Sequence, residues 1–489
     1  MASIRALTWP PLYIVSSIIC SFGGFIFGMD TGIIGPVTVM HKYTADFGTT
    51  SAIVHGLIVS AILIPAAISA FAAGRVADVV GRSKAISLGG LIFGIGAALE
   101  AAAVHLGMFI TGRVIEGFGE GLFLGNLVVY ITEIAPPRSR GTLTSYPQLM
   151  NTIGLTVGFF SCYGTRNLDS SLSWRLPFAL LSAFAVTFAG TSWFWLPESP
   201  RWLLVRGWKN EATRVWDALG VASADREKVE NEQEMGVLEA SGTPERESSE
   251  ADGKSSGWLA AFAPDVRART ILGAFAMGMQ QMSGIDGILY YAPLLFERAG
   301  LSSSRASFLA SGVSAIVIMA ATVPALIYAD AIGRRHSTIG GGFMLSCIMF
   351  LIGSLYASSS VHETHGAGRW IVIASIYVFA VVFCTTWAMG IKTWVAESQP
   401  QRSRSSATNL AYGSNWLTNF LVALTTPVLL DRSSFGAYFL FGGCTLATAV
   451  VCMIWMPETK GKSLEEIEAA FAKKAPGSRS VLRLMRRPF

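Results

Sequence analysis

The sequence predicts an all-α integral membrane protein with twelve transmembrane helices in two six-helix halves. Three observations predict this fold class. Hydrophobic residues make up 52% of the 489 residues and charged residues only 14%, whereas soluble domains carry about 25% charged residues. Apolar runs long enough to cross a bilayer recur along the chain. Short charged motifs near their ends occur in the first half of the chain and again in the second.

A membrane-spanning helix needs about 20 mostly apolar residues. Six such runs occupy the first half of the chain, near 11–37, 54–75, 84–104, 107–134, 142–164 and 174–196. Six more occupy the second half, near 268–296, 307–330, 337–357, 370–396, 405–430 and 434–456. The first run is too long for the apolar core of a signal peptide, so we expect it to be retained.

The composition divides the chain into four parts. Residues 206–266 include the polar stretch "SADREKVENEQEMGVLEASGTPERESSEADGKSSG", which predicts a water-exposed cytoplasmic linker with some short helices. One six-helix half precedes it at 1–205, a second follows at 267–458, and a basic cytoplasmic tail occupies 459–489.

The placement of lysine and arginine predicts the orientation. Nine of these residues lie in four short loops, 74–84, 135–141, 331–336 and 398–404, whereas the longer loops at the opposite ends hold seven. By the positive-inside rule these four loops and both termini are cytoplasmic, and we expect a multi-pass protein of the plasma membrane. The net charge of +5 is scattered among loops, so no nucleic-acid partner is expected.

Metal-ligand spacings and a P-loop are absent from the sequence. The six cysteines fall in apolar runs without C-x-x-C spacing. We therefore expect free thiols, no metal, no cofactor and no enzymatic activity.

Three motifs of the first half recur in the second. "DVVGR" (78–82) returns as "DAIGR" (330–334), "EIAPPRSR" (133–140) as "ESQPQRSR" (397–404), and "PESPR" (197–201) as "PETKG" (457–461). The separations are 252, 264 and 260 residues. Two similar halves around a site at the membrane midplane are typical of transporters.

Together with "GRVIEGFGEG", "PESPRWLL", "QQMSGIDGILYY" and "SNWLTNF", these motifs resemble the sugar porter family of the major facilitator superfamily, in particular its fungal members. The resemblance implies the major facilitator fold and proton-coupled import of a monosaccharide or related sugar or polyol by alternating access. The partners would be the small solute, protons and the lipid bilayer. Symport of an anionic sugar-like solute (a uronate or quinate-type acid), passive sugar facilitation and nutrient sensing remain alternatives.

Asp30, in "FGMDTG", is the candidate for proton coupling. A carboxylate in the bilayer centre costs roughly 2.5–3.5 kcal/mol, and Arg113 in another span is its natural partner. Beside a guanidinium the carboxylate stays ionised, and away from it, in apolar surroundings, it takes up a proton. The resemblance implies that a carboxylate here marks symport, while a static ion pair remains the alternative.

Glu116 and Glu120 follow Arg113 at three and seven residues and share its helix stripe. The family usually has neutral residues at both positions. These carboxylates either neutralise Arg113 or extend a proton path.

By resemblance, the sugar site lies at mid-bilayer between the halves. Amides can donate to and accept from neighbouring hydroxyls, and aromatic rings cover the apolar face of a sugar. A buried glutamine can instead bond a neighbouring helix, but the adjacent Gln280 and Gln281 cannot both face one neighbour. The substrate-binding candidates are Gln148, Gln280, Gln281, Asp286, Tyr290, Tyr291, Lys392, Asn415, Trp416 and Asn419.

Several positions depart from the family pattern. Asp286 replaces the usual asparagine, and Lys392 replaces the second tryptophan of the span near 370–396. Either the two charges pair and neutralise each other, or Lys392 binds an anionic substrate. Met389 replaces a proline of the same span, which predicts a stiffer helix.

Charged residues at the cytoplasmic helix ends can pair across the halves. The resemblance implies a latch that holds the outward-facing state, and simple positive-inside anchoring is the alternative. The latch candidates are Arg82, Glu133, Arg140, Glu198, Arg335, Glu397, Arg404 and Glu458.

Overall fold

The computed structural model describes residues 10–136, 139–221, 262, 266–301, 304–328, 333–362, 366–399, 404–460, 467 and 471, without the side chains of 304–308 and 404–406. These residues are helical with short connections, and no strand occurs among them. Most of the expected linker and tail lies outside them. The chain forms two compact units. Unit 1 comprises Met1–Ile33, Met40–Phe47 and Pro65–Gly253, and unit 2 comprises Ile34–Val39, Gly48–Ile64 and Lys254–Phe489.

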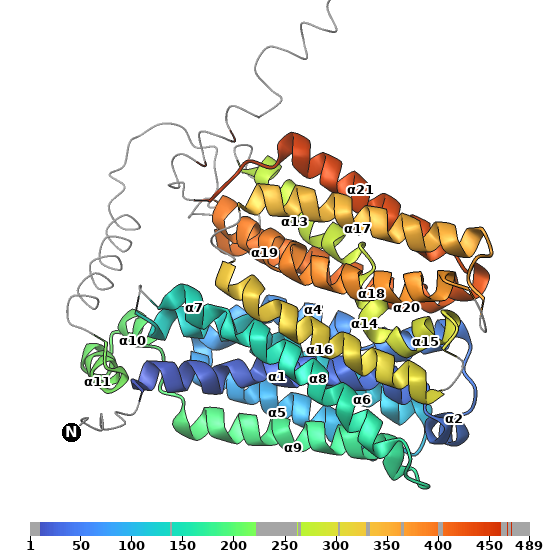
Figure 1. Ribbon diagram of the computed structural model, residues 1–489. Helices are drawn as coiled ribbons and strands as arrows, with labels where there is room; N and C mark the ends of the chain where they lie inside the picture. The colour runs from blue at the N-terminus through green and yellow to red at the C-terminus, as the bar shows by residue number, and fades with distance from the viewer. Residues whose placement is uncertain are drawn as a thin grey trace, which may run out of the picture. The chain divides into compact units, whose positions relative to one another are not determined.

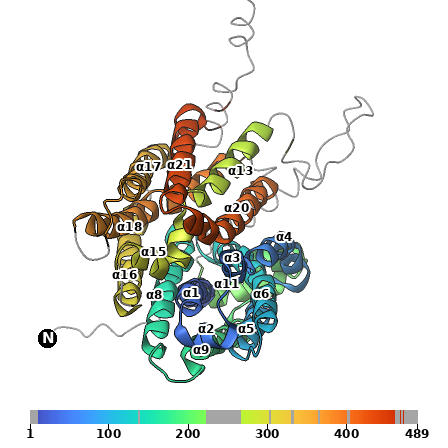
Figure 2. The same ribbon diagram turned by 90° about the vertical axis from the view of Figure 1, so that its right-hand side faces the viewer.

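The helices before the linker follow one another with short turns (Figure 1). They are α1 (Leu12–Thr38), α2 (His41–Phe47), α3 (Ala52–Ser60), α4 (Leu63–Val80), α5 (Arg82–Ala101), α6 (Leu106–Ile134), α7 (Arg140–Thr144), α8 (Tyr146–Thr165), α9 (Leu172–Trp195), α10 (Pro200–Val205) and α11 (Lys209–Leu219). Within unit 1, α5 lies against both α6 and α9 (Figure 2).

The helices after the linker are more often interrupted. They are α13 (Arg267–Gln281), α14 (Ile285–Tyr290), α15 (Ala292–Arg298), α16 (Ser304–Tyr328), α17 (Arg334–Ala357), α18 (Gly368–Thr385), α19 (Trp387–Ser398), α20 (Arg404–Arg432) and α21 (Gly436–Trp455). Within unit 2, α17 lies against α21, and α13 lies against α20 (Figure 1).

Every predicted span coincides with a helix or with consecutive helices. In the described part of the chain, nine such segments are long and apolar enough to cross a membrane by length and composition. The other three predicted spans are α8, α13–α15 and α20. These three contain every predicted sugar-binding residue except Lys392. Polar side chains that serve a site lower the hydropathy of the helices that carry them.

Glycines allow α1 and α8 to approach closely within unit 1. A Cβ atom on Gly24 would lie 2.2 Å from the carbonyl oxygen of Pro147, and one on Gly28 would lie 1.9 Å from that of Asn151. A Cβ on Gly154 of α8 would meet the carbonyl oxygen of Phe25 at 2.0 Å. Small residues at four-residue spacing permit such contact between membrane helices. This packing fixes α1, and therefore Asp30, in unit 1.

Two predicted spans of unit 2 are interrupted. Gly284 joins α13 to α14 with φ +85°, a left-handed conformation that glycine adopts without steric cost. The span near 370–396 breaks at Thr386, between α18 and α19, so the expected stiff helix is not present. The Thr386 hydroxyl donates to the carbonyl of Val382 at 2.6 Å. Such bonds offer the backbone an alternative to regular helix, and the break therefore needs no proline at Met389.

The first part of the predicted linker contains α11, and the chain just before it is attached to the end of α4. In α10, which precedes the linker, the Trp202 indole donates to the carbonyl oxygen of Asp78 at 2.9 Å. The Arg206 guanidinium donates to the same oxygen and to that of Val79. These bonds use carbonyl groups at the end of α4 that have no partner inside the helix.

Candidate functional site

A buried cluster of charges joins three helices of unit 1. Nη1 of Arg113 on α6 lies 2.5 Å from Oδ1 of Asp30 on α1. The same nitrogen lies 3.0 Å from Oε2 of Glu116 and 3.9 Å from Oε2 of Glu100 on α5. Each of these four side chains is 4% exposed or less. The expected Asp30–Arg113 contact therefore exists within a larger cluster in which carboxyl groups outnumber the guanidinium.

Glu100 is the member of this cluster that sequence reasoning missed. It is the only acidic residue in the apolar run 84–104, and an acidic residue inside a span indicates a functional site. That signal was available in the sequence. Its partner could not be read, because the α5–α6 packing decides which side chains meet.

Glu120 lies near the cluster without joining its contacts. It is 1% exposed, and neither of its carboxyl oxygens has a hydrogen-bond partner in the described residues. Of the two carboxylates that sequence reasoning grouped with Arg113, Glu116 therefore contacts the guanidinium and Glu120 does not.

The predicted amides of unit 2 bond to one another and to the backbone. Gln280 donates to the carbonyl oxygen of Trp387 at 2.7 Å, next to the α18–α19 break. Asn415 donates to the carbonyl oxygen of Met277 at 2.8 Å and to Oε1 of Gln280 at 3.3 Å. Gln281 reaches Oδ1 of Asn415 at 3.4 Å. Both the amide nitrogen and the amide oxygen of Gln280 thus have protein partners, and Gln281, half-buried, keeps more of its bonding capacity.

The remaining candidates of α14 and α20 lie in the same unit. Asn419 is 5% exposed, and its Oδ1 has no donor among the described residues. The Tyr291 hydroxyl donates to the carbonyl oxygen of Ala423 at 2.7 Å, so that ring is anchored to α20. Tyr290 is buried and Trp416 half-buried. Asn419 has the most evident unused acceptor of this group.

Gln148 stands apart from the other sugar-binding candidates. It lies half-buried in the first turn of α8 in unit 1, whereas the other nine lie in unit 2. No hydrogen-bond partner of its side chain is present in the described residues, so its amide is available to a solute.

Asp286 and Lys392 do not form the ion pair that was one of the two expectations. No nitrogen–oxygen contact within 4 Å joins them in the described part of unit 2. Asp286 is 9% exposed and its Oδ2 has no donor among the described residues. Lys392 is half-buried on α19. Both charged groups therefore keep free bonding positions.

At the repeated motifs of unit 1, Glu198 accepts hydrogen bonds from the N-terminus of α5. Its Oε1 lies 2.6 Å from the backbone nitrogen of Arg82 and 3.2 Å from that of Ser83. The Arg82 side chain contacts Glu133 at 3.4 Å and Asp78 at 2.6 Å. A carboxylate at a helix N-terminus satisfies free N–H groups and complements the helix dipole.

Unit 2 repeats this arrangement. Glu458 accepts from the backbone nitrogens of Arg334 and Arg335 at 2.9 and 3.1 Å, at the start of α17. The Arg334 side chain contacts Glu397 at 3.1 Å. Burial alone would raise the pKa of Glu458. Hydrogen bonds from the Lys460 backbone, from His336 and from the start of α17 outweigh burial and hold this pKa below its ordinary value.

The ion pairs at these motifs that the structure describes lie within each unit. Arg335, a latch candidate, directs its guanidinium to the carbonyl oxygens of Met456 and Met453. Arg334 instead contacts Glu397, as Arg82 contacts Glu133 in unit 1. Arg140 is half-buried near the start of α7, and the side chain of Arg404 lies outside the described residues. The aligned repeats "DVVGR" and "DAIGR" already match Arg82 to Arg334, and this signal was missed.

Comparison with known proteins decides the family. Residues 16–471 match the family described as "Sugar (and other) transporter". The chain belongs to this sugar transporter family. It is therefore a multi-pass membrane transporter with the major facilitator fold, and not an enzyme.

Relatives and solved structures cover nearly the whole transporter. The low-affinity glucose transporter HXT3 of Saccharomyces cerevisiae is 32% identical over 94% of this chain and 83% of its own length. The galactose transporter of the same yeast is 32% identical over 93% and 81%. The proton:xylose symporter XylE, solved with 6-bromo-6-deoxy-D-glucose, is 26% identical, with a TM-score of 0.76 over 94% of this chain and 99% of that one.

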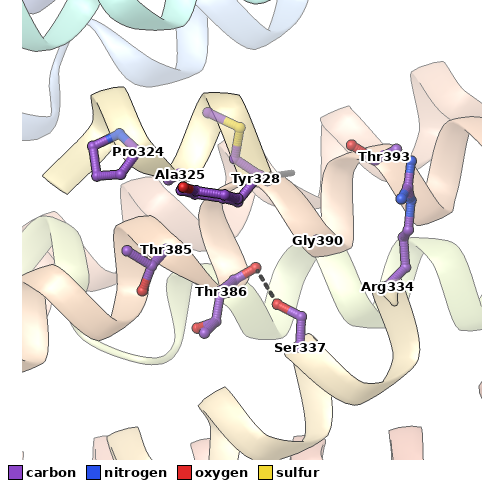
Figure 3. Close-up of a pocket in the computed structure, with 10 residues that line it drawn as sticks. Pro324, Ala325, Tyr328, Arg334, Ser337, Thr385, Thr386, Gly390 and Thr393 are labelled. Atoms are coloured by element: carbon purple, nitrogen blue, oxygen red, sulfur yellow. Dashed lines mark hydrogen bonds between the residues drawn. The ribbon is translucent and has the colours of Figure 1, made fainter. Parts of the chain in front are cut away.

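The transporter also has a pocket of about 170 Å³ within unit 2 (Figure 3). Sites for small ligands typically enclose about 300–1,000 Å³. None of the predicted sugar-binding residues lines this pocket, so we do not assign it to the sugar. It lies between α16, α17 and the α18–α19 break and is lined by Pro324, Ala325, Tyr328, Arg334, Ser337, Thr385, Thr386, Met389, Gly390 and Thr393.

Proposed function

We propose that this sugar transporter imports a hexose or a related sugar or polyol together with a proton, by alternating access. The buried contact between Asp30 and Arg113 carries the proposal. Burying an ionisable pair away from water inside membrane helices costs free energy, and such pairs therefore usually mark a functional site. Proton relays in pumps and transporters are built from such groups. The similarity of this chain to XylE, a proton:xylose symporter, also supports the proposal.

In the proposed cycle, Asp30 alternates between two partners. In one state its carboxylate accepts the hydrogen bond of Arg113, and in the other it carries a proton. Ligands can shift such an equilibrium only through different affinities for the two states. Sugar binding therefore has to favour the protonated state for coupling to result.

We propose that free amide groups bind the sugar hydroxyls. Gln148, Gln281 and Asn419 each have bonding positions that the described protein groups do not fill. Amides donate and accept at once, which suits neighbouring hydroxyls. By the lysine and arginine placement, we further propose a plasma-membrane location with both termini in the cytoplasm.

Uptake in yeast cells that lack their own hexose transporters tests this function. Labelled D-glucose, D-galactose, D-xylose and D-galacturonate are supplied at two external pH values, with and without a protonophore. We expect accumulation to be stronger at acidic pH and to be abolished by the protonophore. Uptake of every sugar that ignores both pH and protonophore would contradict proton coupling and favour passive facilitation.

The Asp30→Asn variant locates the coupling site. Asparagine keeps the shape of the side chain but cannot bind and release a proton. We expect accumulation against a gradient to be lost, with at least about a tenfold fall in the steady-state ratio, while sugar exchange across the membrane continues. Accumulation that survives in D30N would rule out Asp30 as the coupling residue.

A second candidate substrate class is an acidic sugar. The specific observation is that Lys392 and Asp286 do not pair, so the ammonium group can meet a carboxylate of the solute. In the Lys392→Trp variant we expect uptake of D-galacturonate to fall at least about tenfold, the value of one charge-assisted hydrogen bond. Neutral-sugar uptake would persist or rise. Equal losses for neutral and acidic sugars would contradict an anion-binding role.

A further inference from the structure

Glycines bring two glutamates of unit 1 face to face. A Cβ atom on Gly96 of α5 would lie 2.5 Å from the backbone nitrogen of Glu116, and one on Gly112 of α6 would lie 2.6 Å from Cγ of Glu100. Any larger residue would push the two helices apart. The close contact brings the carboxyl groups of Glu100 and Glu116 to the same guanidinium nitrogen of Arg113, at 3.9 and 3.0 Å.

The protein offers this pair too few donors. Neither oxygen of Glu100 has a hydrogen-bond donor in the described residues, and neither does Oε1 of Glu116. Ionised carboxylates only accept hydrogen bonds, so two of them cannot bond each other. A proton on one of the two carboxyl groups supplies the missing donor.

The charge balance also favours a proton on the Glu100–Glu116 pair. Three carboxyl groups lie within 4 Å of a single guanidinium nitrogen, and all are buried. If all three were ionised, two negative charges would remain uncompensated away from water. Each uncompensated buried charge is strongly unfavourable. A proton on the Glu100–Glu116 pair removes one of these two charges and leaves Asp30 as the partner of Arg113.

The other groups around the pair do not replace this proton. Tyr43 of α2 is 2% exposed, and its hydroxyl has no hydrogen-bond partner in the described residues. Glu120 of α6 is a further acid without a donor. From α9, the Arg175 guanidinium is bound to the carbonyl oxygens of Ala101 and Ala103 at the end of α5. Arg113 is therefore the cation that the pair contacts.

We infer that Glu116, sharing a proton with Glu100, passes that proton to Asp30 and replaces it as the partner of Arg113; this inference rests on the proposed proton coupling. The O–H bond of Glu116 breaks and one forms on Asp30, while Arg113 keeps its charge. The Arg113 guanidinium already contacts the carboxyl groups of Asp30 and Glu116, at 2.5 and 3.0 Å, so it moves little. The net charge of the buried cluster is unchanged, which avoids the cost of creating a charge in the membrane.

Two isosteric substitutions in this pair are expected to act in opposite directions. Glu116→Gln removes the carboxylate that receives Arg113, so Asp30 is protonated only at lower pH. Glu100→Gln donates an amide N–H to Glu116, keeps it ionised beside Arg113, and allows Asp30 to be protonated at higher pH. We expect the pH midpoint of uptake to fall by about one unit in E116Q and to rise by about one unit in E100Q.

The measurement uses the purified full-length chain in proteoliposomes with an imposed proton gradient. The probe is whichever of D-glucose, D-galactose, D-xylose and D-galacturonate is transported fastest. Glu120→Gln, on the same helix and equally buried but without a hydrogen bond to Arg113, is the matched control, and its midpoint should shift less than that of either variant. Sugar exchange at fixed pH checks that each variant folds. If E116Q does not fold, the expected rise of the pH midpoint of uptake in E100Q alone tests the inference.

The outcomes separate this inference from the function on which it rests. Wild-type uptake without any pH dependence contradicts the proposed symport itself. If wild-type uptake depends on pH but the midpoints of E100Q and E116Q do not shift, or shift in the same direction, only the shared proton is overturned. The reason is that a merely structural pair alters the amount of active protein and not the pH midpoint of uptake.

Discussion

Glu458 is a single carboxylate that accepts several hydrogen bonds at the end of a helix. It accepts from two backbone nitrogens at the start of α17, from the backbone of Thr459 and Lys460, and from His336. Glu198 does the same for α5 in unit 1. Sequence reasoning found both carboxylates as latch residues, but it could not identify their backbone partners. At this scale the structure describes them as helix caps, and the latch remains a proposal.

The lowered pKa of Glu458 predicts an acid-sensitive contribution to stability. A carboxylate whose pKa is lower in the folded than in the unfolded state stabilises the fold above its ordinary pKa of about 4.5. That contribution disappears as the pH falls through the folded-state value. We expect Glu458→Gln to lower the melting temperature of the purified protein at pH 7.

Melting curves between pH 7 and pH 3 check this expectation. The difference in melting temperature between wild type and E458Q should shrink toward zero at the acid end. A difference that stays constant across the whole range would show that the carboxylate charge does not stabilise α17.

At the scale of elements, close helix contacts position the site. The α1–α8 contact depends on glycines, because the modest attraction between membrane helices requires backbones to approach closely. The α5–α6 contact depends on Gly96 and Gly112 and brings Glu100 to Glu116. Sequence reasoning recognised the glycines beside Asp30 as sites of close approach. It could not single out the glycine contact of α5, because other glycines in the described part of the chain have no close neighbour and look the same in the sequence.

Gly28→Ala tests the α1–α8 contact. The added Cβ would lie 1.9 Å from the carbonyl oxygen of Asn151, and backbone atoms cannot move aside as a flexible side chain could. We expect a loss of stability of about 1–3 kcal/mol, measured by thermal or denaturant unfolding in detergent. Gly164→Ala, on α8 with nothing within 4 Å of its Cβ, is the control and should be neutral or slightly stabilising. Equal stability of the two variants would contradict tight packing at Gly28.

At the scale of the whole molecule, the repeat is visible in both sequence and structure. Arg82, Glu133 and Glu198 in unit 1 have the same contacts as Arg334, Glu397 and Glu458 in unit 2. Equivalent residues make equivalent contacts because both halves place the same three motifs at the same helix ends. The lysine and arginine bias of those loops also determines the expected orientation.

Epitope accessibility checks that orientation. A tag at either terminus of the chain, expressed in intact cells, should bind antibody only after the membrane is permeabilised. A tag inserted in the loop after α8, near Asn167, should bind without permeabilisation. Staining of a terminal tag on intact cells would reverse the predicted topology.

The sequence alone determined the membrane class, the twelve spans, the repeat and the residues Asp30 and Arg113, because these depend on hydropathy and on charges that the bilayer makes conspicuous. The tertiary structure decided which groups meet. It added Glu100 to the charge cluster, assigned the Glu397 contact to Arg334, left Asp286 and Lys392 without an ion pair within 4 Å, and interrupted a span at Thr386. These features depend on how neighbouring helices approach and rotate about their axes, and hydropathy does not encode that geometry.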